Sequence, residues 1–169
     1  MKKIGLLAFC SISLLAFSAY AGAPQLIGEY DDWSAYIYKE GKNSVCYMAS
    51  TPQKSEGKYT RRGDVYLVIT HRPADKSFDV VNFVAGYAYK NDAKVIVKIG
   101  KDTISDFFVE NDKAWTMNAN VDKKLVEAMK KGERLIIDGI STKGTTTKDT
   151  YSLKGFSSAY RAISTKCRR

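Results

Sequence analysis

The chain has 169 residues, of which 27 are lysine or arginine and 18 are aspartate or glutamate, so its formal net charge is +9 at pH 7. This length suits one ordinary domain, and the sequence has no internal repeat, low-complexity stretch or linker, which excludes a repeat or multidomain protein. The single histidine excludes catalytic and metal-binding schemes that need two or more histidines.

Residues 1–21 have the features of a cleavable secretory signal peptide. Lys2-Lys3 supplies the positive start, residues 4–17 are apolar and uncharged, and Ala19-Tyr20-Ala21 is a small-x-small cleavage pattern. The apolar stretch is shorter than the roughly 20 residues that span a bilayer. We therefore expect cleavage near Ala21, a periplasmic or secreted location, and one domain over residues 22–169 without a transmembrane segment.

Two cysteines, Cys46 and Cys167, remain after that cleavage. An even number of cysteines in an oxidising compartment predicts a disulfide bond between them, with two free thiols as the alternative. The bond would close a loop across most of the domain. In the chain-entropy model, a loop of ~100 residues contributes about 4–5 kcal/mol to stability.

Apolar side chains that alternate with a period of two predict that most of the chain is β-strand. Trp33, Ala35 and Ile37 alternate in this way, whereas residues 65–69 form a continuous run typical of a central strand buried on both faces. Further strands are predicted over residues 78–84, 94–99, 103–109, 113–119, 135–140 and 149–153. Short strands separated by turns predict an antiparallel β-sandwich or a barrel-like sheet.

Two segments break the strand pattern and predict helices. Residues 121–131 place their apolar side chains on one helical face, between Asn120 as N-cap and Gly132 as C-cap. Apolar residues from Phe156 to Cys167 recur at steps of three and four, which predicts a short terminal helix that begins near Ser157 or Ser158. The predicted fold is therefore mainly β and single-domain, with one central and one C-terminal helix.

Several short strings lie along the chain in a fixed order: Arg62-Gly63-Asp64-Val65-Tyr66, Thr70-His71-Arg72-Pro73, Gly86-Tyr87, Ala114-Trp115, residues 125–132 and residues 149–159, before Cys167. Together they resemble the invasion-associated locus B family of Gram-negative bacteria, over residues 33–167. The resemblance implies an exported β-rich protein associated with host-cell invasion, without enzymatic activity or catalytic residues. Members tend towards arginine in a Ser-x-Arg-Gly-Thr turn, where this chain has Lys143.

Positively charged side chains are the clearest surface feature, because several of them crowd one polar loop around Tyr59. A basic exported protein attracts anionic lipid headgroups or acidic glycans, whereas export and the lack of a binding motif argue against nucleic acid. We expect surface loops to bind an envelope or host-surface component, with no cofactor and no metal site. The candidate binding residues are Lys54, Lys58, Arg61, Arg62, His71, Arg72 and Lys143.

Other interpretations of these motifs stay open. His71 lies where Pro73 ends a predicted strand. A structural histidine hydrogen-bonded to a neighbouring loop is favoured over a ligand or pH-sensing contact. Arg62-Gly63-Asp64 spells an integrin-recognition tripeptide, but a turn into the following strand is favoured. A periplasmic chaperone or assembly factor would need an apolar groove or an open sheet edge. An enzyme would need a pocket around His71 with acidic partners.

Overall fold

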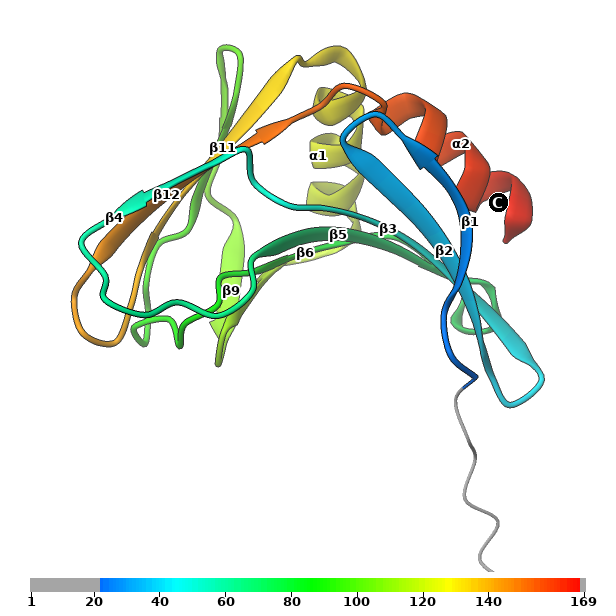
Figure 1. Cartoon of the computed structure of the whole chain (residues 1–169), viewed down its shortest axis with the longest axis horizontal. Helices are drawn as coiled ribbons and strands as arrows, with labels where there is room; N and C mark the ends of the chain where they lie inside the picture. Colours follow the sequence, from blue (N-terminus) through cyan, green and yellow to red (C-terminus); the bar gives the residue numbers. More distant parts are fainter. Residues whose placement is uncertain (1–21, 168–169) are drawn as a thin grey trace, which may run out of the picture.

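The computed structural model describes residues 22–167, and in this range it shows two antiparallel β-sheets and two α-helices (Figure 1). The predicted mainly β class and the antiparallel sandwich are confirmed, and the sheets do not close into a barrel. The predicted signal peptide, residues 1–21, lies outside the described residues.

The larger sheet has seven strands and the smaller sheet has five. In spatial order the seven strands are β1 (Gln25–Tyr30), β2 (Trp33–Glu40), β3 (Asn43–Ser50), β5 (Tyr66–Arg72), β6 (Ser77–Val84), β10 (Lys113–Thr116) and β9 (Phe107–Glu110). The five are β4 (Lys54–Gly57), β12 (Thr146–Ser152), β11 (Arg134–Ile140), β7 (Ile96–Ile99) and β8 (Asp102–Ile104). A single 3₁₀ turn, η1 (Pro73–Asp75), joins β5 to β6.

Both helices lie on the same side of the seven-stranded sheet as the five-stranded sheet does (Figure 1). Helix α1 (Ala119–Lys131) packs on β6, and α2 (Phe156–Lys166) packs on β1, β2 and β3. One continuous core fills the space between these layers, and its largest members include Trp33, Phe83, Leu125, Tyr151 and Phe156. Neither described helix is long and apolar enough to cross a membrane.

The predicted disulfide is confirmed, and it joins the end of α2 to the middle of β3. Cys46 and Cys167 are 121 residues apart in the sequence, and their Cα atoms lie 6.0 Å apart. Both side chains are buried. The bond therefore clamps the last helix onto the face of the seven-stranded sheet.

Both helices begin at residues other than those predicted. Asn118, rather than Asn120, is the N-cap of α1, because its side chain accepts hydrogen bonds from the backbone N–H groups of Asn120 and Val121. Helix α2 begins at Phe156, with Gly155 before it at φ +85°. A side chain at Gly155 would overlap the carbonyl oxygen of Tyr30, so glycine is required there.

Gly132 ends α1 as predicted, but its backbone is extended rather than left-handed. Lack of room for a side chain, rather than a left-handed backbone, explains why glycine occupies this position. A Cβ atom at Gly132 would lie 2.5 Å from Cγ2 of Ile99 and 3.0 Å from Cδ1 of Leu153. The close approach lets the end of α1 pack against Ile99 of the five-stranded sheet and against Leu153, which follows β12.

Three of the predicted strands differ from the structure. The predicted strand over residues 113–119 ends at Thr116, and Ala119 already begins α1. The predicted strand over residues 103–109 is wrong, because Ser105 and Asp106 break it into β8 and β9, which belong to different sheets. Strand β5 is not buried on both faces: its buried residues alternate with partly exposed ones. Its outward face is open because both helices and the other sheet cover the opposite side (Figure 1).

Candidate functional site

A cleft of about 260 Å³ lies between three segments of the chain: residues 58–61, residues 87–88 and residues 141–147. The first segment joins β4 to β5, the second follows β6, and the third contains the β11–β12 turn. Tyrosine rings of Tyr59 and Tyr87 line the cleft, together with the hydroxyl-bearing residues Thr60, Ser141, Thr142, Thr145 and Thr147.

Three of the predicted binding residues, Lys58, Arg61 and Lys143, meet at this cleft. All three are exposed, and the lining contains no aspartate or glutamate. Within residues 22–167, none of the three forms an ion pair with an acidic side chain. The cleft therefore has a local positive potential that attracts anions.

Backbone and side-chain hydrogen bonds hold the β11–β12 turn in place. Two hydrogen bonds join Ser141 and Thr145. The Ser141 N–H donates to the Thr145 carbonyl at 2.9 Å, and the Thr145 N–H donates to Ser141 Oγ at 3.2 Å. The Thr142 N–H also donates to the Ala88 carbonyl at 2.9 Å, which ties the turn to the second segment. Lys143 thus stands at the tip of an ordered turn.

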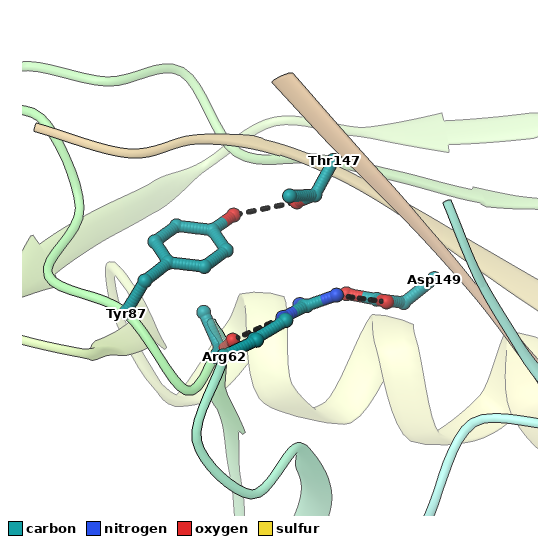
Figure 2. Close-up of polar contacts among 5 residues, drawn as sticks. Arg62, Tyr87, Thr147 and Asp149 are labelled. Carbon is teal, nitrogen blue, oxygen red and sulfur yellow. Dashed lines mark hydrogen bonds and ion pairs between the residues drawn. The ribbon is translucent and has the colours of Figure 1, made fainter. Parts of the chain in front are cut away.

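Arg62 lies beneath the cleft and forms a buried ion pair with Asp149 of β12 (Figure 2). Its Nη1 and Nη2 donate to the two carboxylate oxygens at 2.7 and 2.5 Å, and its Nε donates to the Ala85 carbonyl at 2.7 Å. The two charged side chains are only 5% and 6% exposed. Burial acts to lower the pKa of Arg62, but the hydrogen bonds and charge of Asp149 outweigh it, and the net shift is upward.

The guanidinium of Arg62 also positions the two tyrosines of the cleft. Its central carbon lies 5.4 Å from the Tyr59 ring centroid and 5.1 Å from the Tyr87 ring centroid. The Tyr87 hydroxyl is 2.6 Å from Oγ1 of Thr147 (Figure 2), and burial raises the pKa of Tyr87. One buried cation therefore lies within cation–π distance of both aromatic rings of the cleft.

Arg62 is consequently buried, so the expectation that its side chain belongs to an exposed basic surface is wrong. Because its side chain is turned inward, the tripeptide Arg62-Gly63-Asp64 does not present an arginine for adhesion. The peptide backbone is held too, since the Gly63 N–H donates to the Gly86 carbonyl at 2.8 Å. The contacts of Arg62 are those of a positioning residue for the cleft.

Lys54 and Arg72 lie away from the cleft. Lys54 belongs to β4 rather than to a loop, and its Nζ is 2.9 Å from a carboxylate oxygen of Glu56. Arg72 ends β5 in the other sheet and donates to both carboxylate oxygens of Glu40, at 2.6 and 3.0 Å. These hydrogen bonds hold the pKa of Glu40 below its usual value.

His71 is fully buried, so it does not lie at the surface where the other candidate binding residues were expected. Nδ1 of His71 accepts a hydrogen bond from the Asp79 N–H at 3.1 Å, and Nε2 lies 3.2 Å from Oγ of Ser164 in α2. Because Nδ1 accepts, the neutral ring carries its proton on Nε2 and donates it to Ser164. These contacts match the structural interpretation favoured from the sequence, with partners in β6 and α2 instead of a loop.

A buried carboxylate outside the cleft, Asp122 in the first turn of α1, was not anticipated. Its Oδ1 accepts hydrogen bonds from the Val81 N–H at 2.8 Å and from Thr116 Oγ1 at 2.6 Å. Burial raises the pKa of Asp122, with a smaller contribution from the charge of Asp79, and the two hydrogen bonds only partly oppose this. The residue links α1 to β6 and β10.

The raised pKa of Asp122 predicts a pH-dependent contribution to stability. The folded state binds this proton more tightly than the unfolded state, so the contribution is present at low pH and is lost as pH rises from about 4 through the folded pKa. We expect wild type to lose stability relative to Asp122→Asn over this range, as measured by urea unfolding at several pH values.

Glu56→Gln is the control for this pH dependence, because the hydrogen bond from Lys54 lowers the pKa of Glu56. The sign is then opposite: wild type gains stability relative to Glu56→Gln as pH rises. The interpretation of Asp122 is contradicted if its difference curve is flat or slopes in the same direction as that of Glu56.

The sequence interpretation missed Tyr87, Thr147 and Asp149 as parts of the site. One signal for Asp149 was available, because Thr147, Asp149 and Tyr151 alternate on the inward face of β12. An acidic residue on the buried face of a strand requires a partner of opposite charge. The identity of that partner, 87 residues earlier in the chain, was not evident from spacing.

Comparison with known proteins agrees with the family indicated by the sequence motifs. A family model described as Invasion associated locus B (IalB) protein matches residues 33–164. Searches of curated proteins and of solved structures find no match. The matched region extends from the start of β2 almost to the end of α2, and it contains the whole cleft and the Arg62–Asp149 pair. The chain therefore belongs to the invasion-associated locus B family.

Proposed function

We propose that this protein is an exported, non-enzymatic binding protein that contributes to host-cell invasion or envelope interaction by holding an anionic group in the cleft. The observation that carries the proposal is the convergence of Lys58, Arg61 and Lys143 on one cleft without a neutralising acid among the described residues. The predicted signal peptide and the family membership support the exported location.

The residues of the cleft suit a phosphate, sulfate or carboxylate group on a larger molecule. Lysine acts as a compact point charge, whereas the guanidinium of Arg61 offers a planar set of donors. Hydroxyl groups of Thr142 and Thr145 line the same cleft and add hydrogen-bonding partners for an oxyanion or a sugar. Acidic glycans and anionic lipid headgroups both present such groups.

Neutralising the three cations tests this proposal. We expect the triple variant Lys58→Gln/Arg61→Gln/Lys143→Gln to bind heparin or anionic vesicles about 30-fold more weakly than wild type, taking ~0.7 kcal/mol per lost charge contact. Binding by wild type should also weaken from low to physiological ionic strength. Both can be measured by titration at several salt concentrations, with heparin and vesicles as separate arms.

The matched control removes the same number of charges from α1, by Lys123→Gln/Lys124→Gln/Lys131→Gln. These lysines are exposed and lie outside the cleft. The control should retain most of the wild-type affinity. Equal losses in the two triple variants, or an affinity that does not change with salt, would contradict the assignment of binding to the cleft.

A periplasmic chaperone or assembly factor is the second candidate, and strand β9 is the observation that favours it. β9 is an edge strand of the seven-stranded sheet, and its Phe108 is 46% exposed. An open edge of this kind can accept an additional strand from a client protein. The enzyme alternative has no comparable support, because His71, on which it depends, does not reach the surface.

A further inference from the structure

The outward face of the seven-stranded sheet carries rows of apolar and aromatic side chains. Residues opposite one another in neighbouring strands share a face, so the strand register defines these rows. One row is Leu26, Tyr36, Tyr47, Thr70 and Val80; the next is Ser34, Ala49, Val68, Asn82, Trp115 and Phe108; and a third includes Tyr66 and Val84. Both helices and the five-stranded sheet lie on the other side (Figure 1).

Most of the large exposed hydrophobic side chains gather on this face. Leu26, Tyr66 and Phe108 belong to the rows and are 54%, 36% and 46% exposed. Met117, which is 57% exposed, follows the end of β10 two residues after Trp115. Leu26 and Phe108 stand on the two edge strands, β1 and β9, and the partly exposed side chains of the rows between them make the surface continuous. A continuous surface of this kind marks an interaction site, whereas single exposed apolar residues do not.

The outward face of the five-stranded sheet differs in charge from that of the seven-stranded sheet. It carries charged side chains throughout, namely Lys54, Glu56, Lys98, Arg134, Asp138 and Lys148, and Lys98 bonds Asp138 at 2.7 Å. On the seven-stranded sheet, the charged side chains stand around the rim of the rows: Glu29 begins the second row, Lys113 and Glu110 complete the third, and the Glu40–Arg72 pair lies beyond the first. An uncharged centre with a charged rim is the usual composition of a protein–protein interface.

We propose that this outward face, defined by the three rows, is a self-association surface on which a second copy of the chain packs face to face. The positive net charge opposes self-association, so two copies can meet only through a face whose centre is uncharged, and this face meets that requirement. A twofold axis brings the same face of each copy together, and the uncharged, largely apolar centres of the two faces then meet.

The size of the face is sufficient for a dimer. Strands about 4.8 Å apart and rows about 7 Å apart give about 34 Å² for each side chain, so the three rows, with their charged end members included, cover about 540 Å² per copy. Two copies would bury about 1,100 Å² in total, just above the roughly 1,000 Å² that a specific protein–protein interface needs. The packing of two outward faces would resemble the aligned packing of sheets in a sandwich.

The oligomeric state of the exported protein tests this proposal. We expect sedimentation equilibrium to show a concentration-dependent doubling of mass that persists at physiological ionic strength, because the contact is apolar. Val68→Lys places a charge at the centre of the face and should raise the dimer dissociation constant at least about 100-fold. Phe108→Glu, at an exposed edge position that tolerates a polar side chain, should raise it at least about 10-fold.

Ile136→Lys is the matched control, since Ile136 is a partly exposed isoleucine on the outward face of the other sheet. It should dimerise as wild type does, and circular dichroism should show that all variants are folded. A mass of one chain at every concentration, or equal dissociation by Ile136→Lys and Val68→Lys, would overturn the proposal. So would a monomer that binds neutral vesicles through Val68, which would assign the face to a lipid surface instead.

Discussion

Replacing Arg62 with methionine will lower the free energy of unfolding by about 3–5 kcal/mol, because it leaves the carboxylate of Asp149 buried without its cation. Methionine keeps much of the apolar length of the side chain, so the effect isolates the charge and its hydrogen bonds. The Ala85 carbonyl and both Asp149 oxygens lose their donors at the same time. Urea unfolding at neutral pH measures the change.

The neighbouring variant Arg61→Met serves as the control, since Arg61 is exposed at the cleft and should change stability by less than about 0.5 kcal/mol. The double variant Arg62→Met/Asp149→Leu removes both charges and should recover most of the lost stability. A loss below about 1 kcal/mol for Arg62→Met, or no recovery in the double variant, would show that the pair is not a buried, mutually dependent unit.

Removing the disulfide with Cys46→Ala/Cys167→Ala will lower the free energy of unfolding by about 5 kcal/mol in the chain-entropy model. The bond closes a loop with a sequence separation of 121 residues, and releasing it increases the entropy of the unfolded chain. Denaturant unfolding of the oxidised wild type and the double variant gives the difference. Hydrogen exchange should show the largest local loss of protection in α2, which the bond clamps to β3.

Reduced wild type provides the control for this prediction, because it lacks the bond while keeping both sulfur-bearing side chains. It should lose about as much stability as the alanine variant, apart from the small packing cost of two truncated side chains. A reduced protein as stable as the oxidised one would refute the assigned contribution of the disulfide.

Periodicity in the sequence predicted most of the strands and both helices, because one face of each element packs on the core. It failed at residues 103–109, where the apolar pattern continues although the chain leaves one sheet and enters the other at Ser105 and Asp106. It also assigned two buried faces to β5, because a β-branched and aromatic run looks the same whether its second face is covered or open.

The candidate site was only partly predictable for a related reason. Composition identified the basic residues, and the fold gathers Lys58, Arg61 and Lys143 at one cleft. It did not distinguish Arg62 from its neighbour Arg61, because the difference depends on Asp149, which is distant in the sequence and reaches Arg62 only when β12 is in place. The ion pair with Asp149, which forms only in the folded protein, decides which of the two arginines is buried.

Arg62 is buried and contacts both tyrosines of the cleft. These contacts restrict which substitutions the cleft can accept during evolution. A substitution of Arg62 disturbs stability before any change of ligand preference can be selected. Substituting Lys58, Arg61 or Lys143 does not have this stability cost, because their side chains project from loops on a fixed scaffold. Under the proposed function, these three side chains can therefore be exchanged to change the ligand without disturbing the ion pair beneath them.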